Sequence, residues 1–399
     1  MKETLLNEIC ELIVDCPHST AYDEGKGYPL VRTPNIGRGR LIYDGMHRVC
    51  EDVYNARNAR AVPQENDLIF AREATAGNVA IIQKDEKVCL GQRTVLIRPN
   101  SKLVDPNFLA YFLLAPKQQY NLLSTANGAT VAHVNMPTIR NLKLELPEFS
   151  IQKRIATILS RYDTLIENYQ KQIKLLEEAA QRLYKEWFVD LRFPGYEKVK
   201  VVDGVPEGWE RKKLGEIIEL DPKVPLAKER VKQFVPMQAL SVNSMVMDQT
   251  QFSLTTSNSG SKFQNGDTLL ARITPCLENG KTAYVNCIES NEGGIGSTEY
   301  IVMRSLCYSK YMVYLLARSY KFREYAIKCM SGSDGRQRVQ KDKLSLYMIC
   351  VPKKNLIAKF DCFAKPIFAK IKNLSSQIRN LTESRDRLLV KLMSGEVEV

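Results

Sequence analysis

Residues 151–187 read IQKRIATILSRYDTLIENYQKQIKLLEEAAQRLYKEW, and this segment decides the fold of the chain. Apolar side chains recur there at gaps of three and four, which puts them on one stripe of an α-helix. The helix would extend about 55 Å at about 1.5 Å per residue, more than one compact domain requires. Ser150 is the residue expected to cap its amino terminus. The stripe consists of Ile151, Ile155, Ile158, Tyr162, Ile166, Tyr169, Ile173, Leu176, Ala180, Leu183 and Trp187.

The same stripe returns 205 residues later, at Leu356, Phe360, Phe363, Ile367, Ile371, Leu374, Ile378, Leu381, Arg385, Leu388 and Leu392. Only Arg385 breaks the match. A stripe sustained over about five heptads predicts a coiled-coil seam. The alternative is a pair of amphipathic helices packed on a globular core, and the matched offset argues against it. Pro366 is expected to kink the second helix or to divide it into two segments.

Segments upstream of the two stripes also match one another. Asp67–Arg72 corresponds to Asp267–Arg272, and Val134–Pro147 aligns with Val339–Pro352. The offset drifts from 200 to 205, as loop insertions between two copies of one fold would leave it. The sequence therefore predicts a pseudo-twofold internal repeat, in which a globule followed by a long helix occurs twice.

The residues before each long helix indicate short strands, turns and one helix. Leu142–Leu146 alternates apolar and charged residues, the period of a half-buried strand, and Leu344–Val351 is its counterpart. Such a mixture predicts an α+β globule in each repeat. Further strands are expected at Asp67–Ala71, Val79–Ile82 and Thr94–Ile97, a turn at Thr75–Asn78, and helices at Pro106–Leu123 and Ser309–Ile327.

The composition is that of an ordinary globular protein with an excess of positive charge. The 399 residues are 44% hydrophobic and 26% charged, and the formal net charge is +12. Such an excess points to an anionic partner, and two linked copies suit DNA, a polyanion whose geometry repeats along its axis. No apolar run approaches about 18 residues and no signal-peptide pattern follows Met1, so we expect a cytoplasmic protein without a membrane anchor.

The sequence contains no convincing motif for catalysis or metal binding. Asn279–Thr282 imitates the end of a phosphate-binding loop, but Pro275 stands where that loop needs a glycine. The ten cysteines form no C-x-x-C pair and the histidines, His18, His47 and His133, are scattered, so we expect free buried thiols and no zinc site. A nuclease would need a metal-binding carboxylate cluster, which the sequence does not offer. We therefore expect a protein that binds rather than catalyses.

A family resemblance rests on the junction after the first helix and on the helix ends. The junction reads EWFVDLRFPG at 186–195 and GVPEGWE at 204–210. Gln152–Ala156 opens the first helix, and Leu388–Glu396 closes the second. Together these segments resemble the specificity subunits of type I restriction-modification enzymes over nearly the whole chain. Lys354–Lys359 keeps only part of the family's helix opening, so, with the proline that follows, the straightness of the second helix stays open.

The resemblance implies two target-recognition domains, at 1–150 and 209–352, each reading one half of a split target in double-stranded DNA. It implies that two antiparallel conserved helices, at 151–193 and 353–395 with a linker at 194–208, set the spacing. Two modification subunits would dock on the helices and bring S-adenosylmethionine and adenine-N6 methylation, and a restriction subunit with ATP and Mg would join them for cleavage. No cofactor is expected on this chain itself. The alternative is a coiled-coil scaffold that binds protein partners and no DNA.

The helix stripe would then serve both as the seam between the helices and as a docking surface, and the sequence does not divide its positions between these roles. The positions are Ile155, Tyr162, Tyr169, Leu176 and Leu183 in the first helix, and Phe360, Ile367, Leu374, Leu381 and Leu388 in the second.

Candidate DNA contacts lie on the loops of each globule. Arg72 and Arg272 hold equivalent places before a loop, where a guanidinium can contact guanine or phosphate; a salt bridge inside a repeated scaffold is the alternative. Asp334–Arg338, which aligns near 130–135, mixes arginine and glutamine as groove contacts do, with phosphate contacts as its alternative. A structural histidine and a solvated turn are the alternatives for His133 and for 18–20. The full set is Ser19, Thr20, Arg72, Thr75, Asn78, His133, Asn135, Arg272, Thr274, Arg336, Gln337 and Arg338.

Overall fold

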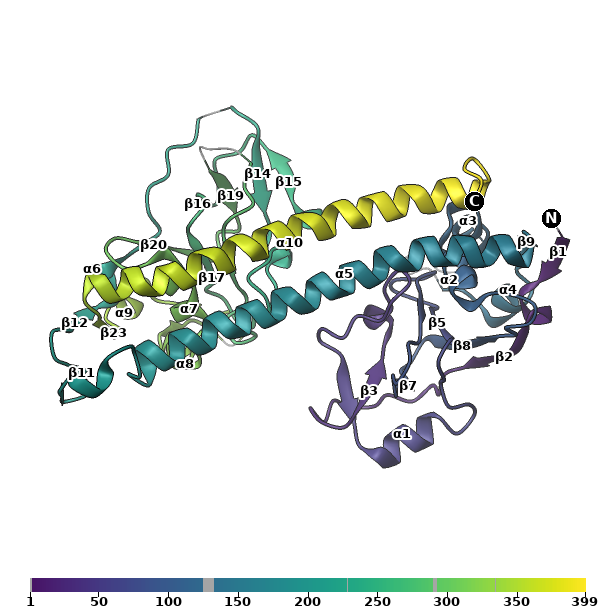
Figure 1. Ribbon diagram of the computed structural model, residues 1–399, viewed down its shortest axis with the longest axis horizontal. Helices are drawn as coiled ribbons and strands as arrows, with labels where there is room; N and C mark the ends of the chain where they lie inside the picture. The colour runs from purple at the N-terminus through teal and green to yellow at the C-terminus, as the bar shows by residue number, and fades with distance from the viewer. Residues whose placement is uncertain (1, 125–132, 228, 290–292, 334) are drawn as a thin grey trace. The chain divides into compact units, whose positions relative to one another are not determined.

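The computed structural model describes residues 2–124, 133–227, 229–289, 293–333 and 335–399 of the chain. These residues form a mixture of helices and strands in two compact units (Figure 1). Unit 1 consists of Met1–Asn168 together with Arg379–Val399, and unit 2 consists of Tyr169–Ile378. Each unit contains part of both long helices.

Unit 1 contains two sheets and a separate strand pair. Its strands are β1 Lys2–Leu5, β2 Cys10–Asp15, β3 Tyr28–Val31, β4 His47–Val49, β5 Leu68–Ala71, β6 Val79–Ile81, β7 Cys89–Leu90, β8 Thr94–Pro99 and β9 Lys143–Leu146. The main sheet is antiparallel in the order β2-β8-β5-β6, and the smaller sheet has the order β4-β3-β7 with β3 parallel to β7. β1 pairs with β9. The predicted strands that fall in this unit are confirmed to within two residues at each end.

Unit 2 repeats this arrangement with its own strands. They are β10 Val201–Val202, β11 Val205–Pro206, β12 Glu210–Lys213, β13 Ile218–Leu220, β14 Lys232–Val235, β15 Ser253–Thr255, β16 Ser261–Phe263, β17 Thr268–Ala271, β18 Thr282–Tyr284, β19 Gly294–Gly296, β20 Tyr300–Ser305, β21 Met330–Ser331, β22 Arg338–Val339 and β23 Met348–Val351. The main sheet has the order β13-β20-β17-β18, and the smaller sheet the order β15-β14-β19-β16 with β14 parallel to β19. β12 pairs with β23, as β1 pairs with β9.

Three predictions about the helices and strands of the globules need correction. The helix expected over Pro106–Leu123 is two helices, α2 Pro106–Leu114 and α3 Pro116–Leu123, because Ala115 precedes a proline and takes an extended backbone with ψ of 146°. The helix expected over Ser309–Ile327 is likewise α7 Lys310–Arg318 and α8 Tyr320–Lys328, divided at an extended serine. The strand expected from Leu344 begins only at Met348, because a short helix, α9, occupies Lys341–Leu344.

Three other short helices complete the globules. They are α1 Glu51–Arg57, α4 Met136–Arg140 and α6 Leu214–Ile217. α1 covers the smaller sheet of unit 1, where Tyr54 stacks on Tyr28 of β3 with ring centres 4.2 Å apart. The sequence pattern did not predict α1, because its seven residues are too few to show a helical period.

The first long helix, α5, spans Phe149–Tyr184 and continues into a π-helical turn at Lys185–Val189. It begins one residue before Ser150, so the capping role expected for Ser150 is wrong. The backbone carbonyl of Glu148 accepts the first hydrogen bonds of the helix instead.

The second long helix, α10, spans Lys354–Ser394 and is one helix of 41 residues. Pro366 lies inside it, so the expected division into two segments is wrong. The proline removes the hydrogen bond that the carbonyl of Cys362 would accept, but both residues are exposed and water can reach that carbonyl. Phe360 and Phe368, before and after the proline, are buried in one apolar core, and this packing keeps the helix continuous.

The long helices share an apolar core inside each unit, formed by residues of the predicted stripes and by residues next to them. In unit 1, Leu159 of α5 shares an apolar core with Leu392 of α10. In unit 2, Tyr184 of α5 packs edge-on against Phe360 of α10, with ring centres 6.3 Å apart. In each unit, residues from opposite ends of the two helices therefore lie together.

Arg385, the one charge in the second stripe, is paired with a buried acid in unit 1. Its Nη1 donates to Oδ1 of Asp163 on α5 over 2.5 Å. The hydroxyl of Tyr111 on α2 donates to the other oxygen, also over 2.5 Å. Asp163 is only 2% exposed, and a carboxylate at such a depth needs partners of this kind.

Candidate nucleic-acid interface

The main sheet of each unit holds the same buried ion pair beside the predicted contact loops. In unit 1, Asp67 accepts two hydrogen bonds of 2.8 Å from the guanidinium of Arg98. In unit 2, Asp267 accepts two of 2.7 Å from the guanidinium of Arg304. Both carboxylates are 1% exposed. This bidentate ion pair fixes the residue directly before β5 or β17. The predicted arginine follows at the other end of the same strand.

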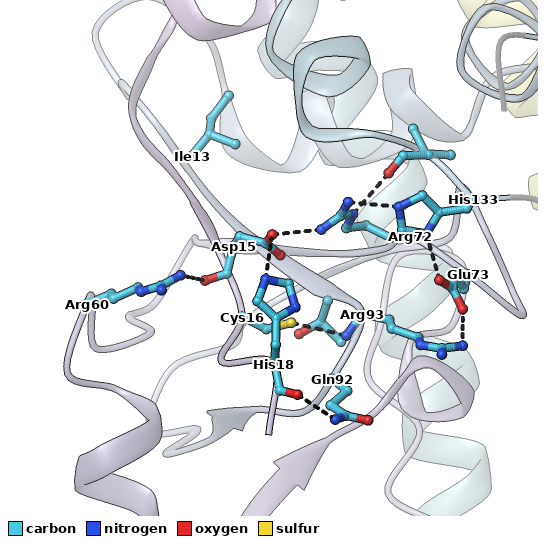
Figure 2. Close-up of polar contacts among 12 residues, drawn as sticks. Ile13, Asp15, Cys16, His18, Arg60, Arg72, Glu73, Gln92, Arg93 and His133 are labelled. Carbon is cyan, nitrogen blue, oxygen red and sulfur yellow. Dashed lines mark hydrogen bonds and ion pairs between the residues drawn. The ribbon is translucent and has the colours of Figure 1, made fainter. Parts of the chain in front are cut away.

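Arg72 follows β5 directly, and unit 1 encloses its guanidinium (Figure 2). Nε donates to the carbonyl of Val134 over 3.0 Å, Nη1 donates to Asp15 Oδ2 over 2.7 Å, and Nη2 lies 2.9 Å from His133 Nε2. The N–H of Val134 donates in return to the carbonyl of Arg72. Arg72 is 7% exposed and each nitrogen of its guanidinium has a partner, as the scaffold alternative requires.

His133 connects Arg72 to a second ion pair (Figure 2). Because a guanidinium only donates, His133 Nε2 must accept, and Nδ1 then donates to Glu73 Oε1 over 2.6 Å. Glu73 also pairs with Arg93. We name Asp15, Arg72, Glu73, Arg93 and His133 the unit 1 loop cluster; with a neutral imidazole its two arginines are matched by two carboxylates.

Arg272 follows β17 as Arg72 follows β5, but it has fewer partners. Its Nη2 donates to the carbonyl of Val339 over 3.0 Å, and the N–H of Val339 donates back to the carbonyl of Arg272 over 2.9 Å. Nε is buried and has no hydrogen-bond partner within the described part of the chain. The backbone bond is thus the same in both units, whereas the carboxylate that neutralises Arg72 has no counterpart bonded to Arg272 among the described residues.

Arg338, predicted as a DNA contact, forms an ion pair with Glu299. Its Nε and Nη2 donate to both carboxylate oxygens over 2.7 to 3.0 Å, and these bonds lower the pKa of Glu299. Glu299 stands directly before β20 as Arg93 stands directly before β8. The side chain of Arg338 remains 45% exposed, so it is paired on one side and open to solvent on the other.

Two of the predicted contacts hold a neighbouring turn instead of lying free. The hydroxyl of Thr75 donates to the carbonyl of Thr33 over 2.9 Å, and the amide of Asn78 donates to the carbonyl of Ile36 over 3.0 Å. Both bonds span 42 residues of sequence and fasten the β5–β6 loop to the turn at 33–36.

The remaining predicted contacts are more open. Ser19, Thr20 and Arg336 are exposed, and no described residue bonds the Arg336 guanidinium. Asn135 precedes α4 without a capping bond from its side chain. Asp334 and residues 130–132, which belong to the same predicted clusters, lie outside the described residues.

Thr274 and Gln337 are brought together by their backbones. The N–H of Thr274 donates to the carbonyl of Gln337 over 3.1 Å. The hydroxyl of Thr274 is buried and, within the described residues, has no partner.

The ten predicted seam positions are all buried or half-buried. Ile155, Phe360 and Leu374 are 3%, 0% and 0% exposed. Burial alone does not separate a seam from a docking surface, so the division of roles between them stays a prediction.

The acidic members of the site are absent from the sequence prediction. Asp15 and Glu299 lie 57 and 39 residues from the arginines they bind, and no local pattern connects such pairs. Glu73 is adjacent to a predicted arginine, and that adjacency is the one available signal. Equivalent places of opposite charge, at Arg93 and Glu299, appear only once the strands are aligned in space.

The described residues show neither a metal-binding cluster nor a membrane-spanning helix. Across 2–124, 133–227, 229–289, 293–333 and 335–399, no group of three or more His, Cys, Asp or Glu side chains is arranged to hold a metal ion. Nor does any helix in these ranges combine the length and apolarity needed to cross a bilayer.

Known proteins of one kind resemble this chain. Residues 1–178 match the family model described as the type I restriction modification DNA specificity domain. The type I restriction enzyme MjaIX specificity subunit of Methanocaldococcus jannaschii is 27% identical over 94% of this chain and 88% of its own length. The HindI specificity subunit of Haemophilus influenzae is 22% identical over 85% of this chain and 88% of its own.

The fold has a counterpart among solved structures. The type I restriction-modification S subunit from M. genitalium aligns over 98% of this chain and 95% of that one, with a TM-score of 0.53 and 14% sequence identity. At that identity the likeness speaks for the fold alone. The family model over residues 1–178, the two relatives that align over most of the chain, and the fold all agree: the chain is similar to the DNA specificity subunits of type I restriction-modification systems.

Proposed function

We propose that each unit of this specificity subunit reads one half of a bipartite target in double-stranded DNA. The observation that carries the proposal is the duplicated frame of the two units. Both hold the buried pair between an aspartate and an arginine, Asp67 with Arg98 and Asp267 with Arg304, and both tie the arginine after the next strand to a valine carbonyl. A shared frame with different loop residues suits two readers of different half-sites.

The pseudo-twofold repeat and the coiled-coil pair belong to the same proposal. The matched strand orders and the helix stripes support an internal duplication in which the antiparallel helices separate the readers. The number of base pairs between the half-sites would then depend on the length of the helices.

Two modification subunits are proposed to dock on the helices. A pocket of about 430 Å³ lies against α5 and the turn that follows it, and its lining combines apolar and charged side chains. Its lining residues are Leu175, Glu178, Ala179, Arg182, Leu183 and Glu186. Leu175 is 62% exposed, and an apolar side chain so open on a long helix suits a protein partner.

The chemistry in this proposal resides on the partner subunits. S-adenosylmethionine would bind the modification subunits, and ATP and Mg would act with the restriction subunit in the full complex. This chain would bind no cofactor and would work in the cytoplasm, where its DNA target lies.

The test is reconstitution of the purified chain with its modification subunits. Genomic DNA treated with the complex and S-adenosylmethionine should acquire methyladenine at one split motif, identified by methylation sequencing. Omission of this chain should abolish the motif. Methylation by this chain without partners, or methylation without a split motif, would overturn the proposal; absence of any salt-sensitive DNA binding would favour the protein scaffold.

A further inference from the structure

We propose that unit 2 holds a contact site for the DNA phosphate backbone, made by Arg272, Thr274 and Arg336, for which unit 1 has no open equivalent. The inference rests on the proposed function, since it takes double-stranded DNA as the partner. It adds that the two equivalent arginines have different roles: Arg72 stabilises the fold of unit 1, and Arg272 binds DNA.

In the unit 1 loop cluster, both arginines are paired with carboxylates. Asp15 neutralises Arg72 directly, and Glu73 joins His133 and Arg93. Because the guanidinium of Arg72 is already bonded at all three nitrogens, a phosphate could bind it only by displacing a protein partner. Such displacement would leave a buried charge unpaired, which is costly.

In unit 2, no described carboxylate is bonded to Arg272 in this way. Asp221, the carboxylate that follows β13, is engaged elsewhere: its oxygens accept from the N–H of Val302 over 2.8 Å and from Lys341 Nζ over 2.7 Å. Glu299 is occupied by Arg338. Among the described residues, the guanidinium groups of Arg272 and Arg336 have no bonded carboxylate, whereas Arg338 has Glu299.

The backbone directs the free donors to one face. Arg272 bonds Val339 and Thr274 bonds Gln337, so 272–274 pairs in antiparallel register with 337–339. Residues directly opposite one another, and residues two apart on one strand, point to the same face of such a ladder. Arg272, Thr274 and Gln337 thus share a face, and Arg336, which precedes Gln337 in the chain, is exposed.

Two hydrogen-bond donors on this face have no acceptor among the described residues. Arg272 Nε can only donate, and it and the Thr274 hydroxyl are buried without a partner among the described residues. Phosphate oxygens only accept, and arginine and threonine side chains are among the usual donors to them. We assign a phosphate rather than a base edge, because Nη2 of Arg272 is held back by the carbonyl of Val339 and a base contact needs a side chain that reaches into the groove.

The experiment measures binding of the full chain to a fluorescent DNA duplex of random sequence at several KCl concentrations. A phosphate contact contributes to such binding whatever the sequence, and each lost contact makes the slope of log K against log salt shallower by about 0.9. Arg272→Gln and Thr274→Val should weaken binding, and Arg272→Gln should show the shallower slope. Arg272→Lys should restore most of that slope, because it keeps the charge.

The matched control is Arg72→Gln, which should lower the unfolding temperature and leave the slope at the wild-type value. Arg336→Gln removes an exposed charge without disturbing the fold, so it should make the slope shallower even if Arg272→Gln unfolds. Wild-type slopes for both Arg272→Gln and Arg336→Gln would overturn the phosphate site while leaving the proposed function intact. A wild-type chain that binds no duplex at all would overturn both.

Discussion

Arg385 of α10 and Asp163 of α5 form an ion pair between the two long helices, at a nitrogen-to-oxygen distance of 2.5 Å. The pair lies in unit 1, where the side chains are 12% and 2% exposed. A buried pair of this kind adds little net stability by itself, but it fixes which residues of the two helices face one another, because any shifted register leaves a charge unpaired.

Removal of one partner should therefore be costly. Arg385→Ala should lower the free energy of unfolding by about 3 to 5 kcal/mol, since the Asp163 carboxylate would stay buried without its cation. Urea denaturation of the full chain measures the change. Arg387→Ala, an exposed arginine on the same helix, is the control and should lie within about 0.5 kcal/mol of wild type. A small effect for Arg385→Ala would show that the pair is open to water in solution.

Glu177 should make unit 2 sensitive to pH. It is half-buried on α5, where it accepts hydrogen bonds from Ser244, Met245 and Tyr314, and its removal from water raises the pKa of its carboxyl above the ordinary value of 4.5. A carboxyl with a raised folded-state pKa favours the folded state at low pH. That contribution is lost as pH rises from 4.5 through the folded-state pKa.

The measurement compares Glu177→Gln with wild type by thermal unfolding across that pH range. The amide keeps an acceptor oxygen and cannot ionise, so the stability of the variant relative to wild type should rise with pH. Glu178→Gln, the exposed neighbour, should show a constant difference. A difference for Glu177→Gln that does not change with pH would mean that the folded and unfolded pKa values are equal.

Pro366 should still cost helix stability although the helix is continuous. Pro366→Ala should raise the unfolding temperature, because it restores a backbone donor; the intrinsic gain in a helix interior is up to about 3 kcal/mol. Ala369→Pro, at another exposed position of α10, should destabilise by a similar amount. A less stable Pro366→Ala would instead assign the proline a favourable role in the packing of α10.

Arg338 should affect reading of one half-site. Arg338→Ala should relax discrimination at one position of that half-site by about 1 to 3 kcal/mol if the arginine contacts a base. Competition binding with duplexes altered one base pair at a time measures this, once the motif is known. Lys328→Ala, an exposed residue paired with Glu324, is the control. Uniform weakening on every duplex would reassign Arg338 to a phosphate contact.

The sequence predicted those features that depend on local periodicity. The stripes predict both long helices, and alternation predicts β9, because burial of one face imposes the same spacing wherever the element lies. It did not predict the break at Ala115 or the continuity at Pro366, because each outcome depends on the balance between a local backbone preference and tertiary packing. At Pro366 the aromatic packing on both sides keeps the helix continuous. At Ala115 the proline that follows breaks the helix.

For the candidate site, the sequence marks the arginines as candidate DNA contacts, which stays a prediction, but it does not mark the carboxylates that bind them. The predicted repeat marks Arg72 and Arg272 as equivalent, but the carboxylate that neutralises Arg72 lies 57 residues away in sequence. Asp15 reaches Arg72 only after β2 pairs with β8. The difference between a closed and an open cluster is therefore a property of tertiary structure, and two equivalent residues in a sequence repeat need not share a function.

The sharing of α10 between the units has a consequence for biosynthesis. Leu389 and Leu392 complete the apolar core of unit 1, although they are made more than 200 residues after its last sheet strand. Unit 2, which needs nothing beyond Ile378, has all its residues first. On the ribosome, the half of the protein that is translated first is therefore the half that matures last, and until then the face of α5 around Leu159 requires protection from aggregation.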